Sequence, residues 1–392
     1  MRVAIISRLP GTDREHNSGL FRTTVDQANV LAKSGVDVTV LSLQTGLGHV
    51  AAGLDPRVKV VYVSRPGRAL NHLTLFLVAA GRLTMALRKL GEFDGVIVHA
   101  TPETGLAAAL LQRYRPLLMV HGIYRRETRP TGSSAWRWAL WAVSSVVEKF
   151  YLWRCRFVLA TSEDIERLLQ NGRTHVTRIT NPVPDEYFDL YPGPDRDPLA
   201  PVVVHIGATV PRKGLDLLVE AWSEVAARFP GATLSIVGQP GPGDEGYYQS
   251  LRKRAADLPQ IHWLGPIDDR ALVALLSTAT VLVHPSRADT APLVIAQAQA
   301  AGVTVLASRV GAIPDMLDEG RAGYLIDGPL TAASVASELI EVLSTPPEHR
   351  EPIRVRARDL AEDRFRGSSV ARSLIAVLSK SNTSKSKGSE AR

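Results

Sequence analysis

The chain has 392 residues, of which 45% are hydrophobic and 22% are charged, a composition typical of a soluble globular protein with two domains. Its formal net charge of +7 suits an anionic ligand or an anionic membrane surface, whereas nucleic acid is not expected as a partner because no nucleic-acid-binding module is recognisable. Cys155 is the only cysteine, which excludes an internal disulfide and fits a reducing compartment.

The N-terminal half alternates short apolar runs with longer amphipathic ones. The opening residues, MRVAIIS, predict a strand and not a secretory signal, and the apolar run 73–80 is far shorter than the ~20 residues that span a bilayer, so we expect a cytoplasmic protein. The predicted strands are 3–6, 36–43, 58–63, 95–99, 117–121 and 156–160. The predicted helices are 20–33, 72–90, 104–114, 135–153 and a helix capped by Ser162 that ends at Gln170. This alternation predicts a doubly wound parallel sheet.

A second array follows a stretch rich in Pro and Asp, 181–201, which has no periodicity and predicts an interdomain connection. The predicted strands are 202–206, 232–237, 261–264, 281–283 and 303–307, and the helices between them are 215–229, 247–256, 271–277 and 292–301. A helical tail is expected from about 348 to 378. The predicted organisation is an N-terminal domain 1–185, a linker 186–201, a C-terminal domain 202–358, a helix 359–379 that crosses to the N-terminal domain, and a disordered tail 380–392.

The stretch 281–308, VLVHPSRADTAPLVIAQAQAAGVTVLAS, is the most informative part of the chain. It predicts a strand, a turn, a helix that begins near Pro292 and ends at Gly302, and a second strand. Such a unit places a helix N-terminus at the carboxyl edge of a parallel sheet, where anionic ligands bind. Asp289 lies on the turn and Gln297 lies eight residues later, so both side chains can face one site.

Pro285-Ser286, Asp289, Gln297 and Ala300-Ala301-Gly302 occur in the order and spacing of a known motif. The chain thereby resembles the retaining glycosyltransferases of family 4. The resemblance covers nearly the whole sequence and implies the GT-B fold, an α/β architecture of two Rossmann-like doubly wound parallel-sheet domains that face an interdomain cleft. It implies a hexosyltransferase that moves a sugar from a nucleotide-diphosphate-sugar donor to a hydroxyl acceptor, a saccharide or a lipid-linked compound, as in cell-envelope polysaccharide or glycolipid synthesis.

The resemblance also implies roles for individual residues. Asp289 would contact the transferred sugar, and His121, which follows a predicted strand and precedes Gly122, would act near the sugar and the acceptor. The remaining positions would bind the donor: Gly19, Arg212, Lys213, Thr290, Ala291, Leu293 and Gln297. Lys213 would neutralise the diphosphate, the amides after Asp289 would hold sugar and diphosphate, and Gln297 would bind the ribose. No cofactor besides the donor is implied, and metal independence is expected because no His, Cys and Asp cluster has metal-ligand spacing.

Three positions depart from the family pattern and leave two functions open. Ala208 stands where the family has Arg, Asp289 and Gln297 stand where it has Glu, and Arg212 could supply the missing charge. The chain is therefore either an active transferase or a catalytically degenerate protein that binds a nucleotide or sugar. A dehydrogenase is disfavoured because no Gly-x-Gly-x-x-Gly follows the first strand.

Four of the six tryptophans lie between Trp136 and Trp153, among basic residues of the segment 125–156. An aromatic and basic helix of this kind can rest on an anionic membrane, which would place the protein peripherally at the inner face of the plasma membrane. It can equally be a core helix whose arginines face water. Both interpretations stay open at this stage.

Overall fold

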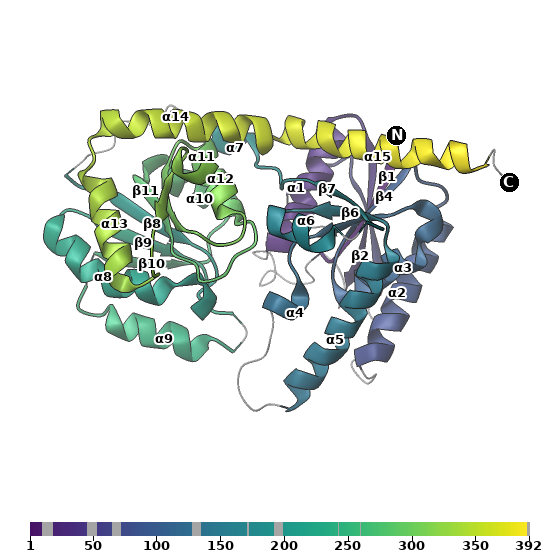
Figure 1. Cartoon of the computed structure of the whole chain (residues 1–392), viewed down its shortest axis with the longest axis horizontal. Helices are drawn as coiled ribbons and strands as arrows, with labels where there is room; N and C mark the ends of the chain where they lie inside the picture. The colour runs from purple at the N-terminus through teal and green to yellow at the C-terminus, as the bar shows by residue number, and fades with distance from the viewer. Residues whose placement is uncertain are drawn as a thin grey trace. The chain divides into compact units, whose positions relative to one another are not determined.

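The computed structural model describes residues 1–9, 19–44, 53–64, 72–127, 135–170, 172–191, 199–241, 243–258 and 260–389, with side chains at most of these positions. The chain forms two compact units (Figure 1). One consists of Met1–Pro182 together with Gly367–Arg392, and the other consists of Val183–Arg366.

The first unit is built on a parallel sheet of seven strands in the order β3-β2-β1-β4-β5-β6-β7. The strands are β1 (Arg2–Ser7), β2 (Asp37–Gln44), β3 (Lys59–Ser64), β4 (Gly95–His99), β5 (Leu117–Val120), β6 (Phe157–Ala160) and β7 (His175–Arg178). Its helices are α1 (Gly19–Lys33), α2 (His72–Lys89), α3 (Pro102–Leu110), η2 (Gln112–Tyr114), α4 (Tyr124–Glu127), α5 (Ala135–Arg154), α6 (Glu163–Leu169) and α15 (Gly367–Ser389).

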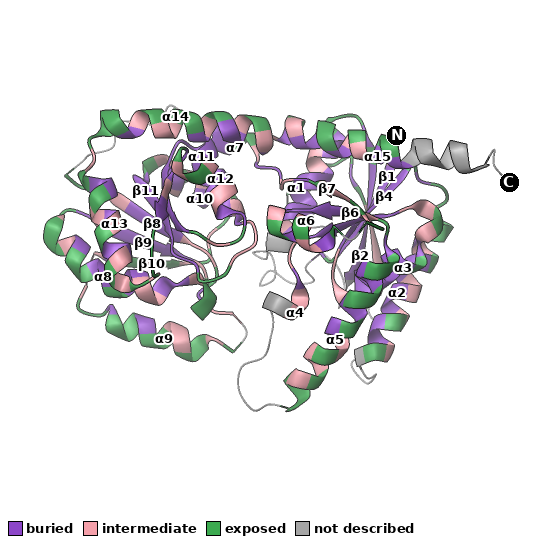
Figure 2. Cartoon of the chain, viewed as in Figure 1, coloured by how far each residue is buried: buried purple, intermediate pink, exposed green. Residues whose placement is uncertain are grey.

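Helices cover both faces of this sheet because successive strand residues point to opposite sides. Val3 and Ile5 pack with α1 and α15, whereas Ala4 and Ile6 pack with α2, α3 and α5. The strands are accordingly buried in the middle of the unit, and exposed residues lie on the outer helix surfaces (Figure 2).

The second unit has a parallel sheet of six strands in the order β10-β9-β8-β11-β12-β13. The strands are β8 (Val202–Ile206), β9 (Thr233–Val237), β10 (Ile261–Gly265), β11 (Val281–His284), β12 (Thr304–Ser308) and β13 (Tyr324–Ile326). The helices are α7 (Asp185–Phe188), η3 (Pro211–Lys213), α8 (Leu215–Arg228), α9 (Glu245–Arg254), α10 (Asp269–Thr278), α11 (Leu293–Ala300), α12 (Ile313–Met316), η4 (Asp318–Gly320), α13 (Ala332–Ser344) and α14 (Pro347–Arg364). Two apolar cores lie on opposite faces of the sheet, one with α8, α9 and α13 and the other with α10, α11 and α12. The α/β class and the two doubly wound sheets are thus as predicted.

The division of the chain differs from the expected one at the connector. The predicted linker 186–201 overlaps α7, and the side chains of Tyr187 and Phe188 are buried in the core of the second unit. Two aromatic residues in a sequence rich in Pro and Asp are enough to anchor this short helix. Residues 192–198 of the predicted linker lie outside the described part.

The tail forms two helices where one was predicted. After α14 the backbone of Arg366 pairs with Val183, whose N–H donates to the Phe365 carbonyl at 2.8 Å, and α15 begins at the next residue. α15 then packs on α1, where a Cβ on Gly367 would lie 2.7 Å from the Val30 side chain. A disordered tail was predicted from residue 380, but α15 continues to Ser389, since a helix that already exists extends without a new nucleus.

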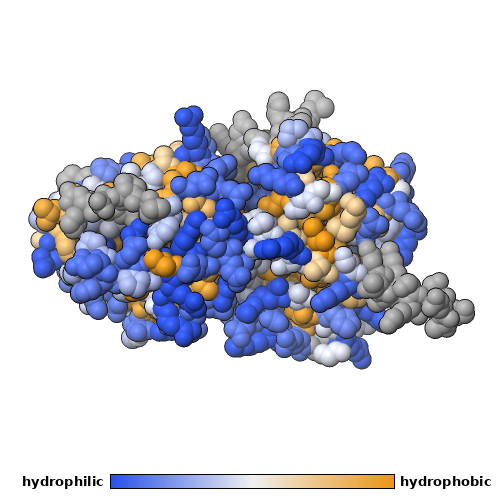
Figure 3. Space-filling model, turned by 90° about the horizontal axis from the view of Figure 1, so that it is seen from above, coloured by the Kyte–Doolittle hydropathy of each residue, from blue (hydrophilic) through white to orange (hydrophobic). Residues whose placement is uncertain are grey.

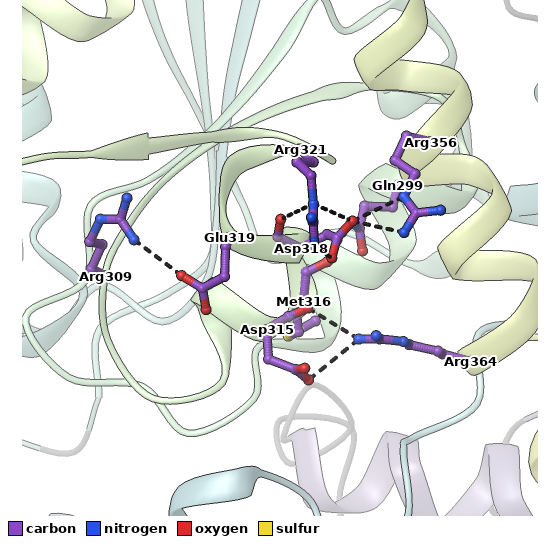
Figure 4. A network of polar contacts seen from close by, with 9 residues as sticks. All are labelled: Gln299, Arg309, Asp315, Met316, Asp318, Glu319, Arg321, Arg356 and Arg364. Atoms are coloured by element: carbon purple, nitrogen blue, oxygen red, sulfur yellow. Dashed lines mark hydrogen bonds and ion pairs between the residues drawn. The ribbon is translucent and has the colours of Figure 1, made fainter.

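Arginines of α14 fasten this helix to the rest of the second unit (Figure 4). Arg356 donates from Nη2 to the Asp318 carboxylate at 2.8 Å, and Arg364 donates to the Asp315 carbonyl at 3.1 Å. The arginines of α14 therefore serve packing within the second unit.

Figure 3 shows a face on which the second unit is mostly hydrophilic, whereas hydrophobic residues gather more over the first unit.

Candidate active site

The strand order of the second unit reverses between β8 and β11, and the loops after these two strands meet at the carboxyl edge of the sheet. This is the position at which doubly wound sheets bind ligands. Gly214 shows how close the loops are: its φ is +67°, and a Cβ there would lie 1.9 Å from the Pro285 carbonyl oxygen. Only glycine fits such a contact in a left-handed conformation.

The contact brings together Lys213 from the first loop and Asp289 from the second, as the motif predicts for one site. The Lys213 ammonium forms an ion pair with Oδ2 of Asp289, and each side chain is only 12% exposed. The same oxygen lies 2.8 Å from Nε2 of His284, at the end of β11, and Oδ1 accepts the Thr290 N–H at 3.0 Å. The buried Ser286 hydroxyl lies 2.9 Å from the same His284 nitrogen. The carboxylate is thus held on three sides.

The charges of this cluster follow from burial and from its contacts. Burial raises the pKa of Asp289, but the hydrogen bond from His284 and the charge of Lys213 outweigh it and hold the pKa well below its usual range. Burial lowers the pKa of His284, and its bond to Asp289 opposes this only in part. At neutral pH the cluster therefore holds a carboxylate, an ammonium and a neutral imidazole that donates from Nε2.

Arg212, predicted to bind the donor, precedes Lys213 but points elsewhere. Its exposed guanidinium donates from Nη1 to the Ala288 carbonyl at 3.3 Å, and its own carbonyl accepts the Arg287 N–H at 2.8 Å. Ala208 is exposed on the same loop. The positive side chain that reaches the Asp289 carboxylate is consequently that of Lys213.

The predicted amide donors lie where the second loop enters α11. The Thr290 carbonyl accepts the Ala312 N–H at 2.8 Å, which braces the turn, and Ala291 and Leu293 are half-buried. Gln297 lies one turn into α11 and is 3% exposed, and its Nε2 has no hydrogen-bond partner among the described residues. A buried polar atom of this kind calls for an explanation.

A second ion pair between the two loops was missed by the sequence analysis. Arg287 donates two parallel bonds to the Asp216 carboxylate, both at 2.7 Å, and the Tyr247 hydroxyl donates to the same carboxylate at 2.8 Å. Burial raises the pKa of Asp216, but these bonds outweigh it and lower the pKa. The sequence does show an acidic residue, Asp216, near the start of the predicted helix. It does not show that the partner of this residue is Arg287, 71 residues away.

In the first unit the predicted His121 follows β5 and lies beside His99 at the end of β4. Nε2 of His121 is 3.0 Å from Nδ1 of His99, and the ring centroids are 5.0 Å apart. Burial lowers the pKa of His121 to about 4 and holds that of His99 well below its usual range. Both rings are therefore neutral at neutral pH.

The loop that carries His121 is held by a buried carboxylate that the sequence analysis did not single out. Glu148 of α5 is 1% exposed and accepts the backbone N–H groups of Tyr124 at 2.6 Å and Arg125 at 3.3 Å. The Arg125 guanidinium lies 3.5 Å from the same carboxylate. This arrangement compensates the buried charge and fixes the start of α4.

The last predicted donor-binding residue, Gly19, is the first residue of α1, and Ser18 before it lies outside the described residues. Within the described part of the chain, no group of three or more His, Cys, Asp or Glu side chains is arranged to hold a metal ion. No helix among those described is long and apolar enough to cross a membrane.

Solved structures identify the class of this fold. Sucrose-phosphate synthase from Thermosynechococcus elongatus aligns with a TM-score of 0.75 at 20% identity, covering 97% of this chain and 98% of that one. Anabaena HepE in complex with UDP and glucose aligns with a TM-score of 0.72 at 17% identity, covering 97% and 99%. The fold is that of the GT-B glycosyltransferases.

Sequence comparison narrows the class to a family. The family described as "Glycosyltransferase Family 4" matches residues 17–187, and that described as "Glycosyl transferases group 1" matches residues 200–345. The D-inositol 3-phosphate glycosyltransferase of Corynebacterium glutamicum is 32% identical over 84% of this chain and 85% of its own. The D-inositol 3-phosphate glycosyltransferase of Corynebacterium efficiens is 33% identical but matches over only 43% of either chain. The phosphatidyl-myo-inositol mannosyltransferase of Mycobacterium tuberculosis is 36% identical over 34% of this chain and 35% of its own. The chain belongs to the family 4 glycosyltransferases.

Proposed function

We propose that this protein is a retaining glycosyltransferase that moves a hexosyl group from a nucleotide-diphosphate-sugar donor to a hydroxyl acceptor without a metal ion or other cofactor. The observation that carries the proposal is the Lys213–Asp289 ion pair, held by His284 at the carboxyl edge of the second sheet beside the start of α11. A basic and an acidic side chain at this point suit a ligand that carries a diphosphate and sugar hydroxyls.

In the proposed reaction the bond between the anomeric carbon and the diphosphate oxygen breaks, and the diphosphate leaves with the electron pair. Lys213 stabilises the charge that develops there, together with the amides of Ala291 and Leu293 at the start of α11, while the Thr290 N–H holds the Asp289 carboxylate beside them. The donor diphosphate replaces Asp289 as the partner of Lys213, which leaves the carboxylate, still bonded to His284, to accept hydrogen bonds from sugar hydroxyls. Arg212 adds positive charge nearby in place of the arginine that is absent at Ala208.

The enclosed amide of Gln297 is proposed to bind the ribose of the donor. Its unpartnered Nε2 supports this role, because a ligand hydroxyl would satisfy that atom. In the first unit, His121 is proposed to contact the reacting sugar and the acceptor, and Gly19 to allow a phosphate to approach the start of α1. The acceptor proton passes to the leaving phosphate on the same face of the sugar, so the protein mainly positions its substrates.

The names of relatives support the choice of substrates. HepE was solved in complex with UDP-glucose, and the relatives above are named for transfer to inositol phosphate and to phosphatidyl-myo-inositol. We propose that the acceptor here is a saccharide or a lipid-linked polyol, in cell-envelope polysaccharide or glycolipid synthesis. The nucleotide base stays open in this proposal.

The exposed surface of α5 supports the proposal of a cytoplasmic protein that contacts the inner face of the plasma membrane. One face of this helix buries Val147, Tyr151 and Leu152, but the opposite face exposes apolar side chains, with Val146 67%, Phe150 45% and Trp153 66% exposed. Lys149 and Arg154 flank them and are exposed as well. Apolar and basic side chains on one exposed stripe favour contact with anionic lipid over the interpretation as a plain core helix.

The test is a transfer assay with UDP-, GDP-, ADP- and dTDP-sugars against inositol phosphate and phosphatidylinositol acceptors, with and without EDTA. We expect one nucleotide to support transfer in EDTA and NMR of the product to show a retained anomeric configuration. Lys213→Met should lower kcat by about 10²–10³, the effect of losing one preorganised donor, whereas Lys253→Met, on the exposed surface of α9, should be neutral. Equal activity of the two variants, or an inverted product, would refute the proposal.

The second candidate is a degenerate protein that binds the nucleotide or sugar without turnover. Ala208 and the uncharged Gln297 favour it. It predicts that a nucleotide raises the unfolding temperature while no donor supports transfer or hydrolysis.

A further inference from the structure

His121, at the carboxyl edge of the first sheet, is joined to a hydrogen-bonded network of buried side chains. Nε2 of His121 lies 3.0 Å from Nδ1 of His99, and Nε2 of His99 lies 3.1 Å from Oε1 of Gln27. The Gln27 amide donates from Nε2 to the sulfur of Met119 at 2.9 Å. Gln27, His99 and Met119 are each fully buried, so water does not substitute for any of these contacts.

The direction of every hydrogen bond in this network follows from its last member, Met119. A thioether sulfur can only accept, so the amide nitrogen of Gln27 must face Met119 and the amide oxygen must face His99. That oxygen can only accept, so the proton of His99 is on Nε2. The buried ring is neutral, and its Nδ1 is therefore an acceptor.

The protonation of His121 follows from that of His99. Because Nδ1 of His99 accepts, Nε2 of His121 must carry the proton that lies between the two rings. The Thr24 hydroxyl lies 3.5 Å from the same Nδ1, a longer contact than the 3.0 Å from His121. The remaining nitrogen of His121, Nδ1, is left with its lone pair.

We propose that Gln27 and His99 are positioning residues that hold His121 in the neutral form protonated at Nε2, so that its Nδ1 accepts a hydrogen bond from a substrate hydroxyl. The ligand class is a sugar or polyol, which presents O–H donors, and an acceptor-only group is disfavoured. The donor sugar and the acceptor share this chemistry, and the kinetic measurements below distinguish them. The inference rests on the proposed function of His121, but the hydrogen-bond directions do not.

The first test is spectroscopic and needs no activity. With ¹⁵N-labelled histidine, the wild-type protein should show one neutral form of His121 protonated at Nε2, with scalar coupling across the hydrogen bond to Nδ1 of His99. A proton on Nδ1 of His99 or of His121 in the wild-type protein would overturn the proposal, whether or not a substrate is ever found.

The second test uses variants of Gln27. Gln27→Met removes the acceptor oxygen of the amide. Gln112→Met makes the same substitution at η2, where the amide donates to the Ala108 carbonyl at 2.8 Å, and serves as the control. We expect the coupling to weaken in Gln27→Met alone, with kcat/KM lower by about five-fold to tenfold, the range of one hydrogen bond between neutral groups.

The Michaelis constants of Gln27→Met distinguish the donor sugar from the acceptor as the source of the hydroxyl. A higher KM for the donor only assigns the hydroxyl to the donor sugar, and a higher KM for the acceptor only assigns it to the acceptor. Coupling that is unchanged in Gln27→Met, or an equal kinetic loss in the control Gln112→Met, would refute the positioning role. If the coupling behaves as expected and no transfer occurs with any donor, the proposed function fails while the assignment of His121 stands.

Discussion

Replacing Gly214 with alanine tests whether the two loops of the second unit must touch for the site to form. The new Cβ would lie 1.9 Å from the Pro285 carbonyl oxygen, so the loops must separate by about 1 Å before the contact is tolerable. That movement pulls Lys213 away from Asp289. A misplacement of about 1 Å can lower activity by about 10²-fold.

The effect on stability has two parts that a matched variant separates. A left-handed backbone costs an alanine about 1–2 kcal/mol, and overpacking adds roughly 1–3 kcal/mol. Gly328 has nearly the same conformation, with φ +74° against +67°, but a Cβ there meets nothing within 4 Å. Gly328→Ala should therefore lose only the first part, which lowers the unfolding temperature by about 2–4 °C per kcal/mol in a domain of this size.

Differential scanning calorimetry and the transfer assay would measure both variants. We expect Gly214→Ala to unfold at a temperature clearly below that of Gly328→Ala and to lose about 10²-fold in kcat/KM, with Gly328→Ala within twofold of the wild type. If the two variants unfold alike and transfer at the same rate, the loop contact does not set the geometry of the site, and the reasoning from Gly214 is wrong.

Three further predictions concern pH and single side chains. The buried His205 has a pKa of about 3 in the folded state, lowered by burial and then by His284, so the unfolded chain binds more protons than the folded one below about pH 6.5. The contribution of His205 to stability should be full above that pH and should fall by about 2 kcal/mol by pH 5. Urea unfolding at the two pH values should therefore show a loss that is smaller by about this amount in His205→Leu than in the wild type. Arg287→Lys should lower the free energy of unfolding by about 1 kcal/mol, because lysine cannot donate two parallel bonds to Asp216; an unchanged urea midpoint would contradict this. Glu148→Gln turns an N–H₂ group towards the buried backbone donors that the carboxylate now accepts and should cost about 1–3 kcal/mol, whereas a stability equal to wild type would show that the loop does not depend on the charge.

Some elements escaped the sequence analysis because their signal is weak without neighbours. β7 and β13 have four and three residues, and β7 is only partly buried, so neither stands out as an apolar run. Helix α13 lies in 309–347, for which no element was predicted. The break between α14 and α15 depends on pairing of Arg366 with Val183, which is remote in sequence.

The amino-acid sequence by itself determined the two parallel sheets, since their buried strands are continuous apolar runs, and it determined which loops carry Lys213 and Asp289, since the motif has a fixed spacing. Only the tertiary structure decided what these side chains touch. Lys213 and Asp289 are 76 residues apart, and Gln27 and His99 are 72 apart, so strand order and the close approach of loops bring them together. The direction of a hydrogen bond, such as that between His121 and His99, depends on every polar group around it, and no local pattern in the sequence records those neighbours.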